Sequence, residues 1–417
     1  MDRSGPGLRI TVLADPKAPE GVAVPALAGR VKEFVFEDDA GKADRFVLTL
    51  ENNDLALFEA EGRDILPGSY LEVSWGYPGS FAPPRRMVVK SIKGGRELKL
   101  EGVALSVQAH REARTRVWHG LKRSDVARLV AAELGYDAPE IEDTVEVLET
   151  INQIGETDAA FLRRMAGREH FEFRIDDTGF HFHPRRADSA PSHIFTWYAD
   201  ETGTILDWTV DQNLMRSVGK VTVRGRDPVA KKDIEASATA ETVARPTLGE
   251  VLEVVDPESG QTHLERANAS VAIHTTRATT QAEAQREADA RFRRAELAAV
   301  KLSATLVGDP TLRAKTVVEL RGLSSAFSGR WYVTWAKHTI GQSGYTTEAR
   351  FARDAKAKLA GGAAMGTSQG GDRNRQTAPE PGGVEEIERV DAETGRTNIE
   401  YRARDRRSGD PEAGGDR

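Results

Sequence analysis

Five short runs of alternating apolar and polar side chains lie within the first hundred residues, and no other feature constrains the fold as strongly. A period of two places successive side chains on opposite faces of a strand. Turn-like clusters such as DDAGKAD, LPGS and KGGR separate the runs. The runs cover Arg30–Asp38, Arg45–Asn52, Ser69–Tyr77, Arg85–Lys93 and Glu97–Leu105. We therefore predict a small antiparallel β-barrel or β-sandwich in residues 1–105.

The remaining 312 of the 417 residues divide by pattern into three further parts. Residues 106–200 mix helical and strand patterns and predict an α/β middle domain with a helix followed by a hairpin. Residues 201–360 return to strand patterns around one long helix, which predicts a second β-barrel domain. Residues 361–417 hold 11 glycines and few large apolar side chains, so we predict a flexible tail that forms a short hairpin or helix when bound.

Three segments carry helical periodicity. We place the first N-cap at Ser124, with Gly135 after the helix end, and the second N-cap at Thr157 or Asp158. The apolar faces are expected to be Val126, Leu129, Val130 and Leu134 in the first helix, Phe161, Leu162, Met165 and Ala166 in the second, and Ala284, Ala288, Phe292, Ala295 and Ala299 in the third. The small residues of the third helix favour close packing on a sheet.

The two strand-rich regions resemble each other. Ile65–Gly76 (ILPGSYLEVSWG) is similar to Thr311–Gly322 (TLRAKTVVELRG), and Arg85–Gly95 is similar to Gly329–Gly341. Another strand-like run follows each second segment. The chain is therefore predicted to carry two related β-units. A trimer of such chains would present six similar units around one axis.

The stretch DDTGFHFHPRR contains two histidines, His181 and His183, and raises the question of a metal site. A four-residue connection pairs Ile175 with Phe180 and Phe173 with Phe182 in a hairpin, which places Arg174 opposite His181 and Glu172 opposite His183. The phenylalanines then share an inward face, and both histidines lie on an exposed polar face. Because Arg174 would repel a cation, we expect no metal here and expect both histidines to be replaceable.

Composition excludes several classes of site. The chain has no cysteine, so disulfides, thiolate metal sites and cysteine nucleophiles are absent. A net charge of −7 and a pI near 5.8 argue against a general nucleic-acid binder. The N-terminus lacks the pattern of a secretory signal, and no apolar run is long enough to span a membrane.

Enzymatic motifs are absent as well. The sequence contains no GxSxG, HExxH or Walker loop. The acid pairs Asp38/Asp39 and Glu385/Glu386 are typical of turns and solvated faces, and no helix follows the strand glycines Gly219 and Gly225. In GRWYVTWAKH, period two places Trp331 and Trp335 on one face as core or interface anchors and Tyr332 on the other. We expect no catalytic, cofactor-binding or metal-binding residues.

Three blocks resemble a known family. They are WHGLKRSDVARLVAAELGY, ETDAAFLRRMAGREHFEFRIDDTGFHFHPR and GDPTLRAKTVVELRGLSSAFSGRWYVTWAKHTIGQSGYTTEARFAR. They are similar to the phage late-control D proteins, the baseplate hubs of contractile tails, which are related to the T4 hub protein and to the N-terminal half of type VI spike proteins. The resemblance covers roughly Arg30–Arg353 and implies two tube-type β-barrels with an α/β portion between them.

The resemblance further implies a homotrimeric, pseudo-six-fold ring that joins a hexameric tail tube to a trimeric spike. No spike β-helix or lysozyme-like domain is recognisable, so the spike is expected to be a separate protein. Further partners would be the tube protein, other baseplate proteins or a tape measure, in a particle assembled in the bacterial cytoplasm. Two rival functions stay open, a tail-associated cell-wall hydrolase and a host-surface glycan-binding tail protein.

Overall fold

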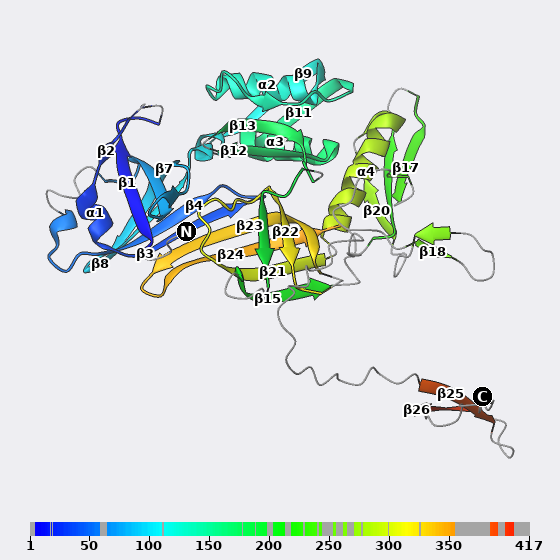
Figure 1. The fold of residues 1–417 in the computed structure, drawn as a ribbon. Coiled ribbons are helices and arrows are strands. Elements are labelled where there is room, and N and C mark those ends of the chain that lie inside the picture. The colour runs from blue at the N-terminus through cyan, green and yellow to red at the C-terminus, as the bar shows by residue number, and fades with distance from the viewer. Residues whose placement is uncertain are drawn as a thin grey trace, which may run out of the picture. The chain divides into compact units, whose positions relative to one another are not determined.

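Antiparallel strands dominate the computed structural model of the protein (Figure 1). The chain forms two units, residues 1–362 and residues 363–417. The structure describes residues 5–354 and 384–403 except 17, 19, 59–64, 111, 177, 188, 198–202, 213–217, 228–229, 240–241, 244–252, 256–261, 265–270, 277, 299, 325–326 and 391–396. None of the helices in these residues is long and apolar enough to cross a membrane.

The first strand-rich region forms the predicted strands to within one residue at each end. They are β3 (Val31–Asp39), β4 (Arg45–Glu51), β5 (Tyr70–Tyr77), β7 (Arg85–Gly94) and β8 (Glu97–Ala104), and they pair in the order β3-β4-β8-β7-β5. Short elements complete this region: β1 (Gly7–Leu13), β2 (Val22–Ala23), α1 (Pro25–Gly29), the 3-10 turn Ala56–Phe58 and β6 (Ser80–Phe81). Strand β1 pairs with the outer edge of β5.

The second strand-rich region repeats this order. It consists of β15 (Ile205–Gln212), β21 (Val300–Val307), β22 (Val317–Arg321), β23 (Gly329–Gly341) and β24 (Gly344–Arg353), paired as β15-β21-β24-β23-β22. A short strand, β14 (His193–Thr196), lies parallel to β22 at its outer edge. Each strand therefore has a positional equivalent in the first region, as the internal sequence similarity predicts.

The equivalence extends to the β-bulges. The pairing of β3 with β4 shifts between Val31 and Glu33, and that of β15 with β21 shifts between Ile205 and Asp207. A second bulge lies between Val89 and Ser91 in β7 and between Val333 and Trp335 in β23. A bulge adds one unpaired residue and changes the local twist. Two bulges at matching positions in each region indicate two copies of one β-unit, which we call repeat 1 (β3–β8) and repeat 2 (β15 and β21–β24).

The two repeats join edge to edge. Strand β23 pairs with β3 in antiparallel register from Trp335↔Asp39 to Ile340↔Phe34, so both repeats form one 14-stranded sheet. Within the described residues its hydrogen-bonded path is open, from β15 at one end to β2 at the other. Two barrels are predicted from the sequence, whereas the strand pairing shows two repeats of one continuous β-rich sheet.

The middle part contains the predicted helices and hairpin. Its elements are the 3-10 turn Leu105–His110, β9 (Ala113–Lys122), α2 (Arg123–Glu133), β10 (Glu140–Ile141), β11 (Val147–Thr157), α3 (Asp158–Glu169), β12 (Phe171–Asp176) and β13 (Gly179–Pro184). Thr157 caps α3 as predicted, because its side chain accepts a hydrogen bond from the Ala160 amide. The N-cap of α2 is Lys122 instead of Ser124, since the Asp125 carboxylate accepts from the Lys122 amide.

The apolar faces of these two helices meet in one core. All four predicted residues of α3 are buried, together with Val126 and Val130 of α2 and the hairpin phenylalanines Phe180 and Phe182. The prediction for Leu129 is wrong, since 47% of its surface is exposed. It lies one residue before Val130, and neighbouring positions on a helix point about 100° apart.

An αβ layer interrupts repeat 2 between β15 and β21. It consists of β16 (Lys220–Arg226), β17 (Asp233–Thr239), β20 (Val271–Thr275) and α4 (Gln281–Leu297), with the separate pair β18 (Glu253–Val255) and β19 (Thr262–Leu264). Helix α4 packs on β16 and β17 through Ala284, Ala288 and Phe292, as its small-residue stripe predicts. Ala299 of that stripe lies outside the described residues.

The second unit contains one hairpin. Strand β25 (Val384–Val390) pairs with β26 (Thr397–Ala403) in antiparallel register. A hairpin is one of the two structures, hairpin or helix, that the sequence predicts for this segment. The other residues of the predicted tail lie outside the described part of the chain.

Candidate functional site

The hairpin that carries the two histidines has the predicted register. Ile175 pairs with Phe180, Phe173 with Phe182, Arg174 with His181 and Glu172 with His183. Asp176 starts the turn and accepts a hydrogen bond from the Thr178 amide at 2.8 Å, and Gly179 takes a positive φ of 131°. The turn length fixes the register, because hairpin loops of a given length select one pairing.

The polar face of this hairpin is buried, which corrects the prediction that both histidines are exposed. His181 is 6% exposed and His183 is 2% exposed. Repeat 2 covers this face: the Tyr332 hydroxyl donates to the Glu172 carboxylate, and Arg313 lies 3.8 Å from Asp176. Both partners follow the hairpin by more than a hundred residues, so the local pattern could not reveal them.

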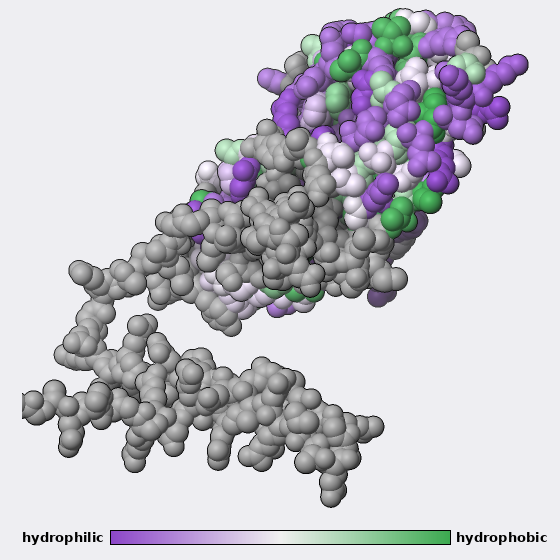
Figure 2. Space-filling view, turned by 90° about the vertical axis from the view of Figure 1, so that its right-hand side faces the viewer, coloured by the Kyte–Doolittle hydropathy of each residue, from purple (hydrophilic) through white to green (hydrophobic). Residues whose placement is uncertain are grey.

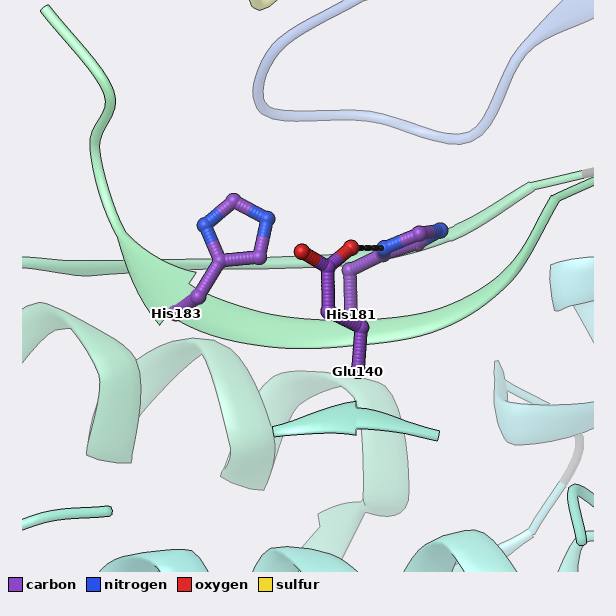
Figure 3. Close-up of side chains that lie close together, drawn as sticks. All are labelled: Glu140, His181 and His183. Carbon is purple, nitrogen blue, oxygen red and sulfur yellow. Dashed lines mark hydrogen bonds and ion pairs between the residues drawn. The ribbon is translucent and has the colours of Figure 1, made fainter. Parts of the chain in front are cut away.

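A third side chain joins the histidines. Strand β10 pairs in parallel with β13, and this register places Glu140 beside His181. Figure 3 shows the Glu140 carboxylate between the two imidazole rings. Its Oε2 lies 2.7 Å from His181 Nδ1, and one potential ligand atom from each of the three residues lies within 4.8 Å of the others. We call Glu140, His181 and His183 the Glu–His–His cluster.

The outer ring nitrogens are held by other groups. His181 Nε2 lies 2.8 Å from Thr178 Oγ1 and 3.3 Å from Asp176 Oδ1, and His183 Nδ1 lies 2.8 Å from the Pro184 carbonyl. Because a carbonyl only accepts, His183 Nδ1 donates to Pro184. His183 Nε2 is buried and has no hydrogen-bond partner among the described residues.

Burial and pairing shift the ionisation of the cluster. Burial raises the pKa of the Glu140 carboxyl, but hydrogen bonds from His181 and Arg186 outweigh it and leave this pKa below its usual value. Burial lowers the pKa of His183. Burial likewise raises the pKa of Asp176, but the bonds from His181 and Thr178 outweigh it and lower this pKa strongly.

Buried polar groups also link the two repeats. Lys315 Nζ lies 2.8 Å from Asp38 Oδ1, and the Ala314 amide donates to Asp38 Oδ2 at 3.1 Å. The Tyr345 hydroxyl lies 2.8 Å from His338 Nδ1 and accepts from the Trp75 indole at 3.2 Å. Asp38 and Trp75 belong to repeat 1 and the other residues to repeat 2. Asp38 is therefore part of a buried junction between the two repeats, which corrects the prediction that it lies in a turn or on a solvated face.

A cavity of about 870 Å³ lies between β11, α3 and α4. Its lining alternates basic and acidic side chains that pair with one another. Arg164 Nη2 lies 2.5 Å from Glu156, and Arg291 Nη2 lies 2.7 Å from Glu287. These charges of the lining are therefore neutralised in pairs.

The aromatic residues of β23 are arranged differently from the prediction. Trp331 and Val333 lie in the core of repeat 2, but the bulge after Val333 turns Trp335 to the opposite face. Trp335 therefore does not share a face with Trp331. The Arg350 guanidinium lies 4.4 Å from the centre of the Trp335 ring. Period two fails here because a bulge inserts one residue.

A family comparison covers most of both repeats. The family model described as the Alg8 N-terminal domain matches residues 49–342. The chain belongs to this family. That description names no activity, so it adds no chemistry to the cluster. No curated protein matches the chain in sequence.

Solved structures show what the fold resembles. A tail protein from Neisseria meningitidis MC58 has a TM-score of 0.62 at 15% identity, over 84% of this chain and 97% of that protein. The 43 kDa tail protein of prophage MuSo2 from Shewanella oneidensis has a TM-score of 0.59 at 14% identity, over 84% of this chain and all of that protein.

A third similar structure comes from a secretion system. The E. coli c3393 protein, described as a component of the type VI secretion system with structural similarity to the T4 tail proteins gp27 and gp5, has a TM-score of 0.52 at 9% identity. It aligns over 84% of this chain and 79% of its own length. The chain therefore has the fold of phage tail proteins and of a type VI secretion component.

Proposed function

We propose that this chain is a structural, non-enzymatic baseplate hub subunit of a contractile tail or injection system. Three copies would form a ring of pseudo-six-fold symmetry that joins a hexameric tube to a trimeric spike. The observation that carries the proposal is the duplicated β-unit with its matching bulges. Two equivalent units in each of three chains give six units, which reconciles a six-fold partner with a three-fold one.

The junction between the repeats supplies a template for contacts between chains. Strand β3 of repeat 1 pairs through its outer edge with the C-terminal half of β23 of repeat 2. The equivalent of β3 is β15, whose outer edge has no strand partner among the described residues. The equivalent half-strand in repeat 1 is Ser91–Gly94 of β7, and β5 pairs only with Arg85–Val88 of that strand.

The exposure of side chains on β15 is consistent with the lack of a neighbouring strand among the described residues. Val210 is 37% exposed, while its equivalent in β3, Phe36, is 1% exposed. An unpaired edge strand with exposed apolar side chains is a ready template for another strand. We propose that β15 of one chain pairs with the end of β7 in the next, in the register of β3 with β23. At the junction between the repeats, Lys337 faces Glu37. Lys93 is the equivalent of Lys337 and Asp211 is the equivalent of Glu37, so Lys93 would face Asp211 between chains.

One face of the shared sheet is polar across both repeats. Cross-strand partners share a face, and on this face Arg45 Nη2 lies 2.9 Å from Glu37 and Lys337 Nζ lies 2.9 Å from Glu348. Lys93 and Glu101 lie 3.8 Å apart on the same face. We propose that this face lines the lumen of the ring, where mixed and paired charges would not hold a passing nucleic acid.

Engineered disulfides test the register directly. The chain has no cysteine, so Lys93→Cys with Asp211→Cys would introduce its only two thiols. Directly opposed residues have Cβ atoms about 4.5–5.5 Å apart, close to what a disulfide spans. Under mild oxidation we expect a covalent trimer on non-reducing gels. Its mass would be three times the 45.6 kDa of one chain.

The matched control moves one thiol along the same strand. Asp207→Cys replaces another exposed acid of β15, about 13 Å from position 211 at 3.3 Å per residue, and should not cross-link efficiently with Lys93→Cys. A trimer without the Lys93–Asp211 cross-link would refute the register alone. A chain that stays monomeric with its spike and tube partners would refute the hub. Lysis of peptidoglycan or specific glycan binding would favour the two rival functions.

A further inference from the structure

We propose that the Glu–His–His cluster is a binding site for one zinc ion. Its ligands would be His181 Nδ1, His183 Nε2 and the Glu140 carboxylate. Two imidazoles and one carboxylate form a donor set that borderline divalent metals, zinc above all, accept readily. The inference rests on the geometry of the middle part and does not depend on the hub role.

The unpartnered nitrogen of His183 is the first observation. Its Nδ1 donates to the Pro184 carbonyl, so Nε2 of the neutral ring carries a lone pair. In the part of the chain that the structure describes, this buried nitrogen has no hydrogen-bond partner, and a carboxylate oxygen of Glu140 belongs to the same cluster of ligand atoms within 4.8 Å of one another. A buried lone pair beside a carboxylate oxygen is an arrangement that a cation can bridge.

The groups behind the two rings are the second observation. Metal-binding histidines commonly donate their other N–H to a carboxylate or a backbone carbonyl, which fixes the ring and raises its basicity. Both rings have such a partner here. His181 Nε2 lies 3.3 Å from Asp176 Oδ1, and His183 Nδ1 lies 2.8 Å from the Pro184 carbonyl. Each ring is therefore held with its other nitrogen toward Glu140 (Figure 3).

The basic residues around the cluster are held by acids. Arg174 Nε lies 3.0 Å from Asp176, and Arg185 Nε lies 2.8 Å from Glu172. Repulsion of a cation by Arg174 is the reason to expect no metal here, and this repulsion is weaker because Asp176 neutralises Arg174. Arg186 is the basic residue that bonds Glu140 itself, and its side chain is 56% exposed. Arg186 would therefore compete with zinc for this carboxylate and can move into solvent when zinc binds.

Zinc titration of the purified full chain tests the proposal. The protein is stripped with a chelator, returned to chelator-free buffer and titrated with zinc by calorimetry, with Co²⁺ absorbance as a second readout. We expect one zinc per chain and a rise in melting temperature on binding. Glu140→Gln and His183→Gln should each weaken binding at least tenfold. Arg186→Gln should tighten binding, which a merely structural role of the cluster would not predict.

The control variant is His119→Gln, which removes an exposed histidine from β9. It should bind zinc as the unmodified chain does. Glu140 is 42% exposed, so Glu140→Gln keeps the test valid if His183→Gln does not fold. The proposal is overturned if the chain binds no stoichiometric zinc at micromolar concentrations. It is also overturned if Glu140→Gln binds zinc as tightly as the unmodified chain, or if Arg186→Gln binds no more tightly.

Discussion

Replacing Lys315 by Met should be among the most destabilising single changes in this protein. The Lys315 side chain is 9% exposed, and its Nζ lies 2.8 Å from Asp38 and 4.0 Å from Asp44. Met preserves the length and apolar body of the side chain but removes the positive charge. The two carboxylates then remain in a buried junction without their nearest cation. Removing one partner of a buried ion pair costs about 3–5 kcal/mol, and we expect a loss in this range.

The pH dependence of this loss has a definite sign. Burial raises the pKa of Asp44, and the negative charge of Asp38 adds to the effect. Lys315 counteracts this rise, so without the lysine the Asp44 carboxyl is still harder to ionise in the folded state than in the unfolded chain. The destabilisation is therefore largest at neutral pH and decreases as the pH falls and the Asp44 carboxyl becomes protonated.

Urea unfolding, followed by the fluorescence of the six tryptophans, measures the loss. The double variant Lys315→Met with Asp38→Asn provides the control, because Asn removes one buried charge and keeps an acceptor for the Ala314 amide. We expect it to recover at least half of the lost free energy of unfolding. A loss below about 1 kcal/mol in the single variant, typical of an exposed ion pair, would refute the reasoning. So would a double variant no more stable than the single one.

Three further predictions concern stability. The Phe182 side chain has 0% exposure, so Phe182→Ala should lower the free energy of unfolding in urea titrations by about 3–5 kcal/mol. Arg186→Ala, at an exposed residue, should change this free energy little. Burial lowers the pKa of His338 to about 4. The free energy of unfolding should therefore fall by up to roughly 3 kcal/mol as the pH decreases from about 6.5 toward 4. The decrease should be smaller in His338→Gln. Gly102→Ala would place a Cβ atom 2.0 Å from the Phe46 ring, so its melting temperature should fall, whereas Gly95→Ala meets no atom within 4 Å and should not lower it.

Local patterns were sufficient to predict the strands and the histidine hairpin. Period two and turn residues define β3 to β8, because adjacent strands joined by short turns pair with one another. The register of the hairpin follows from its turn, and its four phenylalanines pack on the inward face where the alternation places them. In these cases the information that determines the structure lies within a few residues.

Features that depend on distant segments were missed. Glu140 precedes His181 by 41 positions and joins it only because β10 pairs in parallel with β13. The polar face of the hairpin contacts repeat 2 through Tyr332 and Arg313, which bind Glu172 and Asp176 and follow them by more than a hundred residues. The bulge in β23 has an equivalent in β7, and it turns Trp335 to the face opposite Trp331. Period two assumes an uninterrupted strand, so the pattern alone does not predict this arrangement.

The outer edges of the sheet are covered differently in the two repeats, and this difference bears on the function. In repeat 1 the outer edge of β5 is covered by β1, and in repeat 2 the outer edge of β22 is covered by β14. These two covering strands run in opposite senses relative to the strands they protect, so they are not copies of each other. Each repeat has therefore acquired its own cover on the same edge. The opposite edge is closed by β23 in repeat 1 but lacks a strand in repeat 2, among the residues that the structure describes. Because exposed edges promote aggregation and are normally blocked, the open edge of β15 argues for a partner of the kind that closes β3. By the equivalence of the repeats, another copy of the same chain is the partner that the proposed ring would supply.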